Sequence, residues 1–121
     1  MHNARTFSRP QATECSLSDL NCTLHSLYVH PIKSCAGLSL QEATVTSLGL
    51  MTEQIYDREW MVVDENGMCL TQREHPRMAL IKPALKGTTL EVQAPGMLRL
   101  EIPLGLPDPA TAPTLTTRLW E

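Results

Sequence analysis

Aromatic residues and positive charge are both scarce in this sequence. Phe, Trp and Tyr make up 4% of the chain, and ten basic residues against thirteen acidic ones give a formal net charge of −3. A nucleic-acid-binding surface needs a basic patch, and a single-strand binder also needs aromatic side chains on which bases stack. The composition therefore predicts that nucleic acid is not a partner.

Long apolar runs are also missing. No window approaches the roughly 20 apolar residues of a membrane-spanning helix. The start of the chain, Met1 to Arg5, leads into no hydrophobic segment of the signal-peptide kind. We therefore expect no membrane association and a cytoplasmic location.

The four cysteines are irregularly spaced, at Cys15, Cys22, Cys35 and Cys69, and form no Cys-x-x-Cys pair. This spacing argues against a structural zinc site and against a secreted disulfide framework, so we expect reduced thiols and no bound metal. Cys35 is the one cysteine with a second interpretation, because the neighbouring Lys33 would favour its thiolate. The preferred interpretation of Cys35 is a small buried hydrophobic residue.

The chain is long enough for one folded domain with its own core. Its 121 residues are 42% hydrophobic and 19% charged, which is ordinary for a globular protein. Residues 1–23 are polar without an apolar period, and several prolines follow Ile102. We therefore predict a flexible N-terminal tail over 1–23, a domain over 24–104, and a Pro-rich tail or linker over 105–121.

Short apolar segments alternate with turn signals throughout the predicted domain. No amphipathic helix is longer than a turn or two, which favours an all-β sandwich or barrel. The length suits a small closed antiparallel β-barrel, and this is the fold that we predict. The expected strands, with a hairpin turn at Asp64 to Gly67, cover residues 24–29, 38–46, 55–64, 68–70, 78–81, 88–94 and 97–102.

The polar loop His30 to Gly37 follows the first expected strand directly. Lys33 and Ser34 in this loop offer a point charge, a hydroxyl and backbone N–H groups to an anion. Arg58, on the longest expected strand, offers a planar fork that matches phosphate. We therefore predict that Lys33, Ser34 and Arg58 form one side of an anion site.

A plainer explanation of these residues remains open at this point. Strand alternation places Arg58 on the same face as Tyr56, Trp60 and Val62, where a guanidinium needs a partner or a place at the rim. An internal ion pair or a surface arginine whose stem covers apolar residues would account for it equally well. A Lys-Ser pair in a loop is usually only solvated, and we assign no role to His30.

A set of short motifs, in a fixed order, extends from Leu24 to about Leu104. The sequence resembles the N-terminal β-barrel domain of MOSC proteins, a family that includes the mitochondrial amidoxime-reducing proteins and bacterial relatives. The motifs are His30–Gly37, Gly49-Leu50, Asp57–Val63, Asn66-Gly67, Thr71-Gln72-Arg73 and Pro76-Arg77, with Ala112-Pro113-Thr114 and Leu119-Trp120 resembling the closing segment of that domain.

The resemblance implies a molybdenum cofactor. In that family the barrel packs against a MOSC domain, and the residues at the positions of Lys33, Ser34 and Arg58 would contact the phosphate of the pterin. Arg73 is a weaker candidate that could instead only stabilise the barrel. The metal-ligating cysteine would belong to the MOSC domain, which does not follow Trp120 in this sequence, and neither Cys35 nor Cys69 matches it.

Three functional hypotheses follow. The first is the phosphate-binding side of a molybdenum-cofactor oxidoreductase that is completed by a MOSC domain on another chain or has lost it, without catalysis by this chain alone. It predicts an apolar surface patch for the missing domain. The second is a non-enzymatic interaction module or remnant that binds no cofactor. The third is a generic all-β domain without a ligand.

Overall fold

The regular secondary structure of the described residues is almost entirely β-strand. The computed structural model describes residues 5–8, 21–53, 55–105 and 110–119. Within these ranges no helix has the length and apolar character needed to cross a membrane. The elements, in chain order, are β1 (Arg5–Ser8), β2 (Leu27–Val29), β3 (Leu38–Leu40), β4 (Glu42–Thr46), β5 (Gly49–Thr52), β6 (Ile55–Tyr56), the 3-10 helix η2 (Pro76–Leu80), β7 (Lys82–Lys86), β8 (Thr89–Gln93) and β9 (Leu100–Pro103).

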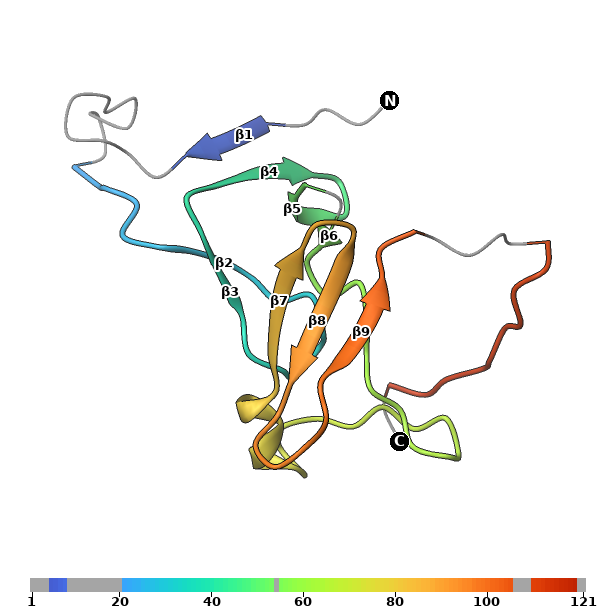
Figure 1. The fold of residues 1–121 in the computed structure, drawn as a ribbon. Helices are drawn as coiled ribbons and strands as arrows, with labels where there is room; N and C mark the ends of the chain where they lie inside the picture. The colour runs from blue at the N-terminus through green and yellow to red at the C-terminus, as the bar shows by residue number, and fades with distance from the viewer. Residues whose placement is uncertain (1–4, 9–20, 54, 106–109, 120–121) are drawn as a thin grey trace.

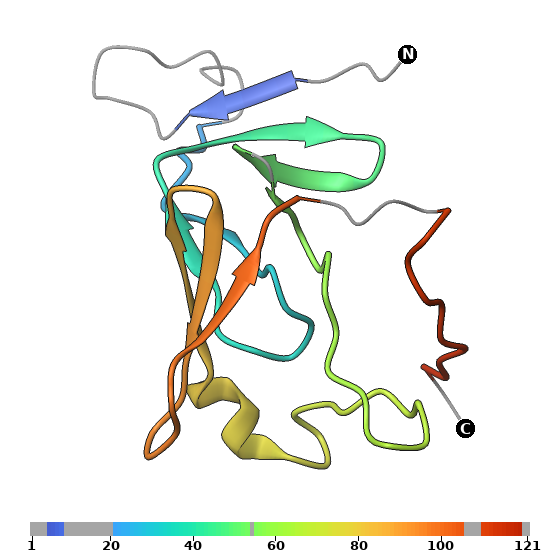
Figure 2. The same cartoon turned by 45° about the vertical axis from the view of Figure 1, so that its right-hand side comes forward.

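The strands form three antiparallel sheets (Figures 1 and 2). Their orders are β1-β4-β5-β6, β2-β3 and β7-β8-β9. The predicted all-β class is therefore confirmed. Among the described strands no ladder closes the three sheets into one barrel, so the closed barrel stays a prediction.

The four-stranded sheet includes part of the expected N-terminal tail. Strand β1 pairs with β4, with Arg5 opposite Val45 and Ser8 opposite Glu42. Residues 5–8 therefore have structure where we expected none, while residues 1–4 and 9–20 of that tail lie outside the described ones. The expected strand 38–46 is divided at Gln41, where the chain bends from the β2-β3 sheet into the four-stranded sheet.

The prediction of one long strand over residues 55–64 is wrong. Strand β6 ends at Tyr56, and Arg58 adopts the left-handed region with φ 55°, which interrupts any strand. The turn at Asp64 to Gly67 is present, because Asp64 Oδ1 accepts the backbone N–H groups of Asn66 at 2.8 Å and Met68 at 2.9 Å. The chain that returns from this turn forms only an isolated bridge, Val63 with Cys69.

The prediction of a strand over residues 78–81 is also wrong, because those residues belong mainly to η2. Pro76 occupies the first turn of this helix, where its missing N–H costs nothing and its fixed φ suits a helix. Met78 points into the core with 6% of its surface exposed. An apolar run of four residues fits a buried helical turn as well as a strand.

The C-terminal segment packs back onto the domain. Arg118 pairs with Met68 in a parallel bridge, and the Arg118 carbonyl oxygen accepts a hydrogen bond from the backbone N–H of Cys69 at 2.9 Å. A side chain at Gly67 would meet the Thr116 carbonyl oxygen at 2.8 Å, so this approach requires glycine. Residues 116–118 therefore lie beside the 64–69 turn (Figure 1).

The core lies between the β7-β8-β9 sheet and the loops that cross behind it (Figure 2). Leu90 and Ile55 are fully buried in it. Two residues of the polar loop, Ile32 and Cys35, belong to the same cluster as these strand residues. The loop that carries the predicted anion site is therefore part of the hydrophobic core.

Replacing Leu90 with Ala should lower the free energy of unfolding by about 2–5 kcal/mol, because it leaves a cavity in the core. The control is Leu48→Ala, at a side chain that is 69% exposed, for which the change should stay within about 0.5 kcal/mol. Urea unfolding followed by circular dichroism measures both. Equal losses in the two variants would contradict this placement of the core.

Candidate functional site

Two segments far apart in the sequence lie side by side at the predicted site. The Lys33 N–H donates to the Trp60 carbonyl at 2.8 Å, and the Trp60 N–H donates to the Pro31 carbonyl at 2.9 Å. The Arg58 N–H donates to the His30 carbonyl at 2.6 Å. Ile32 and Trp60 form a parallel bridge. The loop 30–37 and the segment 57–60 therefore form one hydrogen-bonded unit.

The loop alternates between inward and outward residues. Ile32 and Cys35 are buried, while Lys33 and Ser34 between them are half-exposed. Burial raises the pKa of the Cys35 thiol, so this environment favours the neutral thiol and not the thiolate. The interpretation of Cys35 as a buried hydrophobic residue is therefore preferred over a reactive cysteine.

The two ends of the loop touch each other. His30 Nδ1 lies 3.4 Å from the Cys35 carbonyl oxygen, and a side chain at Gly37 would meet the His30 ring carbon Cε1 at 2.8 Å. Gly37 is needed because the imidazole occupies the space of its side chain. His30 therefore closes the loop, a role that we did not predict.

Ser34 holds a strained backbone conformation at the tip of the loop. Its φ is 68°, which costs a residue with a Cβ roughly 1–2 kcal/mol. The Cys35 N–H donates to the Ile32 carbonyl at 3.1 Å across this turn, and Gln72 Nε2 donates to the Ser34 carbonyl at 2.9 Å. These contacts hold Ser34 in place and tie a third segment, next to Arg73, to the loop.

Arg58 is also a non-glycine residue with positive φ. Its side chain is 54% exposed and forms an ion pair with Asp57. The other oxygen of that carboxylate, Oδ1, accepts the His30 N–H at 2.7 Å. The expectation that Arg58 shares a strand face with Trp60 is wrong because its left-handed backbone breaks the alternation. Trp60 packs against the core, while Arg58 is exposed.

The structure brings the backbones of the predicted residues onto neighbouring segments. Lys33 and Ser34 lie on the loop, Arg58 lies on the segment paired with it, and Arg73 follows the residue that bonds to Ser34. All four lie on the exposed or half-exposed side of these segments. The convergence of their side chains on one anion stays a prediction.

Asp57 and Gln72 are the contacts that sequence reasoning missed. Both lie beside residues that we singled out, Arg58 and Arg73, within the quoted motifs. A short polar side chain next to a predicted ligand is a signal of a supporting role, because ligands need orientation. Nothing in the local pattern showed that their partners would be His30 and Ser34.

Glu59 carries a buried oxygen without a partner. Its Oε2 is the one buried side-chain oxygen or nitrogen among the described residues that accepts or donates no hydrogen bond. Burial raises the pKa of Glu59, and a backbone hydrogen bond at Tyr56 opposes this shift only in part. Burial therefore disfavours the charged form of this carboxyl group, which lies next to Arg58.

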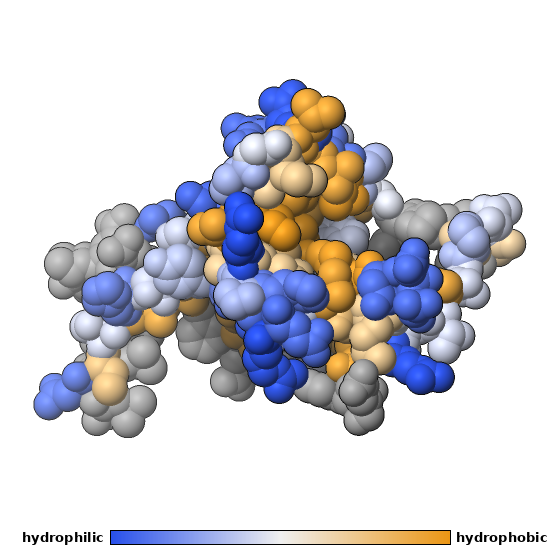
Figure 3. All heavy atoms as spheres, turned by 90° about the horizontal axis from the view of Figure 1, so that it is seen from below, coloured by the Kyte–Doolittle hydropathy of each residue, from blue (hydrophilic) through white to orange (hydrophobic). Residues whose placement is uncertain are grey.

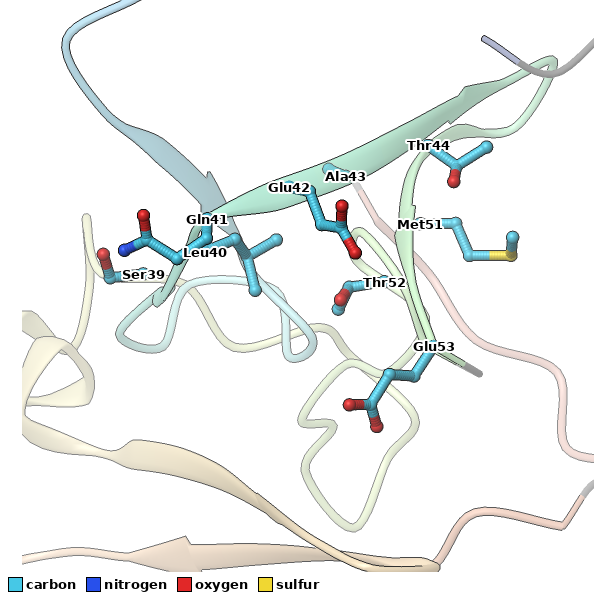
Figure 4. Close-up of a pocket in the computed structure, with 9 residues that line it drawn as sticks. All are labelled: Ser39, Leu40, Gln41, Glu42, Ala43, Thr44, Met51, Thr52 and Glu53. Atoms are coloured by element: carbon cyan, nitrogen blue, oxygen red, sulfur yellow. The ribbon is translucent and has the colours of Figure 1, made fainter. Parts of the chain in front are cut away.

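A separate cavity of about 280 Å³ lies where β3, β4 and β5 meet. In Figure 4 the side chain of Glu42 extends toward Thr52, and Glu53 extends away from it. None of the four predicted site residues lines this cavity. Within the described ranges, no group of three or more His, Cys, Asp or Glu side chains could hold a metal ion.

The sequence model of the MOSC N-terminal beta barrel domain matches residues 21–121. The chain therefore belongs to the family of MOSC N-terminal domains, as the motifs around His30–Gly37 and Asp57–Val63 predicted. The match includes the closing segment that packs against the 64–69 turn.

Relatives of two kinds share this domain. Mitochondrial amidoxime reducing component 2 of Rattus norvegicus is 40% identical over 85 residues, which are 70% of this chain and 25% of the relative. Molybdenum cofactor sulfurase of Danio rerio is 42% identical over 86 residues, which are 69% of this chain and 10% of the relative. The chain therefore spans a quarter or less of the length of these two relatives.

Replacing Ser34 with Gly should raise the free energy of unfolding by about 0.5–1 kcal/mol, because glycine adopts positive φ without steric cost but loses more entropy on folding. Ser34→Ala is the matched control, since it removes the hydroxyl and keeps the strain. Urea unfolding of both variants separates the two effects. A glycine variant no more stable than the alanine variant would contradict the strain.

Replacing Glu59 with Gln should stabilise the protein at neutral pH. With a raised pKa, the folded state binds the proton more readily than the unfolded chain, so stability falls as pH rises from the ordinary pKa of 4.5 through the folded one. The uncharged variant avoids this loss. Thermal unfolding across pH should show its advantage shrinking toward acid pH, and an advantage independent of pH would contradict the assignment.

Proposed function

We propose that this domain contributes the phosphate-binding side of a molybdenum-cofactor site in an oxidoreductase that is completed by a MOSC domain. Lys33, Ser34 and Arg58 would hold the phosphate of the pterin, with Arg73 as a weaker contact. The observation that carries the proposal is the strained backbone of both Ser34 and Arg58 on two paired segments. Strain of this kind concentrates at ligand sites.

The donor set fits a phosphate. An ammonium, a hydroxyl and guanidinium forks are the groups that bind phosphate oxygens most strongly in proteins. They stand on segments already ordered by the core, so little conformational entropy would be lost on binding. When bound, the cofactor supplies the redox chemistry, and the residues of this chain would bind and orient its phosphate end.

Asp57 supports the proposal although its charge opposes an anion. Its two oxygens are engaged, one with the His30 N–H and one with the Arg58 guanidinium. A guanidinium carries five N–H donors, so the remaining ones stay available to a ligand. We therefore assign Asp57 a positioning role, with a phosphate affinity lower than a free guanidinium would give.

The catalytic part of the proposal rests on the relatives. Their names refer to amidoxime reduction and to sulfuration of the molybdenum cofactor, and this chain covers only part of each. The proposed partner of this domain is a MOSC domain, which would supply the metal-binding part of the site. A cytoplasmic location stays a prediction of the sequence.

The alternative function is an interaction module without a cofactor. We distinguished the two by the surface, since a missing domain should leave an apolar patch. Exposed large apolar residues are present, and Leu98 is 96% and Met97 72% exposed. On the lower face of the molecule, hydrophobic residues lie uncovered between hydrophilic ones (Figure 3). This favours an interface on this face of the domain.

Replacing Arg58 with Ala should weaken the binding of inorganic phosphate by roughly 10- to 100-fold, because a charge-assisted hydrogen bond is worth roughly 1.5–3 kcal/mol. The matched control is Arg77→Ala, which removes an exposed cation on η2 and should leave the affinity unchanged. Calorimetric titration of the intact chain measures both.

Equal affinities for the wild-type protein and Arg58→Ala would show that Arg58 is not part of the site. Absence of saturable phosphate binding by the wild-type protein would favour the interaction module.

A further inference from the structure

Strand β9 has an open edge. It is the last strand of the β7-β8-β9 sheet, and no described residue pairs with its outer side. The Leu104 N–H donates to the Thr88 carbonyl at 3.0 Å. Because antiparallel residues alternate in their bonding, Leu100 and Ile102 bond to β8, while Arg99 and Glu101 direct their backbone groups outward. Such an edge is a template for another strand.

The apolar face of β9 runs out of the core into solvent. Leu90 and Val92 of the neighbouring strand are buried, and they lie opposite Ile102 and Leu100. Ile102 packs against the core, but Leu100 is 57% exposed and Leu98 is 96% exposed. Three apolar residues on one face therefore become progressively uncovered toward the β8–β9 turn.

The other face of β9 is charged. Arg99 forms ion pairs with Glu101 at 3.3 Å and with Glu91 of β8 at 3.6 Å. Glu91 lies opposite Glu101 in the β8-β9 pairing, so these contacts place the Arg99 side chain on the charged face with Glu91 and Glu101. One face carries three apolar residues, and the other carries one positive and one negative charge.

We propose that β9 pairs antiparallel with β9 of a second copy of this chain, about a two-fold axis at Leu100. In this register each Arg99 lies opposite Glu101 of the other copy, and each pair exchanges its outward backbone hydrogen bonds. Leu98 lies opposite Ile102, and Leu100 meets its own copy. The two sheets would form one continuous sheet. On its apolar face, Leu98 and Leu100 of each copy would pack beside Ile102 and Leu100 of the other.

The charges select this register over its neighbours. Moving the axis by one residue would place Arg99 opposite Arg99 or Glu101 opposite Glu101, and like charges directly opposite each other are destabilising. In a register that places an outward-facing residue of one strand opposite an inward-facing residue of the other, the backbone hydrogen bonds between the two copies cannot form. A segment that is complementary to itself in both charge and apolar pattern fits an isologous contact. The contact is small, so the dimer should be weak and dependent on concentration. It is independent of the phosphate site.

Pro103 is compatible with this edge. It has no N–H to donate, and its backbone nitrogen lies on the outward side, as expected of proline in an edge strand. The proposed ladder uses the outward N–H groups of Arg99 and Glu101 and therefore does not need a donor at this position.

The test is a charge exchange followed by analytical ultracentrifugation over a concentration series. The wild-type chain should dimerise. Arg99→Glu and Glu101→Arg should each weaken the dimer by roughly tenfold or more, because each places like charges opposite each other. The double variant carrying both substitutions restores the two opposite-charge pairs between the copies and should regain the dimer.

A second variant keeps the test independent of the ion pairs within each chain. Leu100→Lys places two ammonium groups together on the axis and should abolish the dimer, while Leu48→Lys in the β4–β5 turn should not. Circular dichroism confirms that each variant is folded. A monomeric wild-type chain, a dimer unaffected by these changes, or an edge that binds only a separate MOSC-domain chain would overturn the proposal.

Discussion

Ile32 and Trp60 meet in a parallel bridge between two segments far apart in the sequence. Ile32 is buried in the core, and Trp60 packs against the same cluster. The backbone hydrogen bonds on either side of this bridge join the polar loop to the segment that carries Arg58. The loop is fixed by apolar packing on its inner side and by the Gln72 hydrogen bond to the Ser34 carbonyl, so that its outer side presents Lys33 and Ser34.

This arrangement accounts for the strained residues of the candidate site. Ser34 and Arg58 keep unfavourable backbone conformations because the core, Gln72 and Asp57 fix the chain around them. A site built in this way is ordered before its ligand arrives, which lowers the entropy lost on binding. We propose that the site binds and orients a phosphate group.

Local sequence pattern was sufficient for the all-β class, the turn at Asp64 to Gly67, and the alternating strand around Leu90. It failed where a distant contact decides the local conformation. The alternation over 55–64 predicted one strand, but the chain turns at Arg58, which has a positive φ. The neighbouring Asp57 is held there by a hydrogen bond from the backbone N–H of His30, 27 positions away. The motifs located the loop and Arg58, but no pattern within either segment shows that they lie side by side.

The most direct test of this account is a nuclear magnetic resonance titration of the isotope-labelled chain with inorganic phosphate and then with a phosphorylated pterin. We predict that the backbone amide signals of Lys33, Ser34, Arg58 and Arg73 shift together and saturate with one dissociation constant. Shifts that never saturate, or that fall on other segments while these four signals stay unchanged, would contradict a shared anion site on the paired segments.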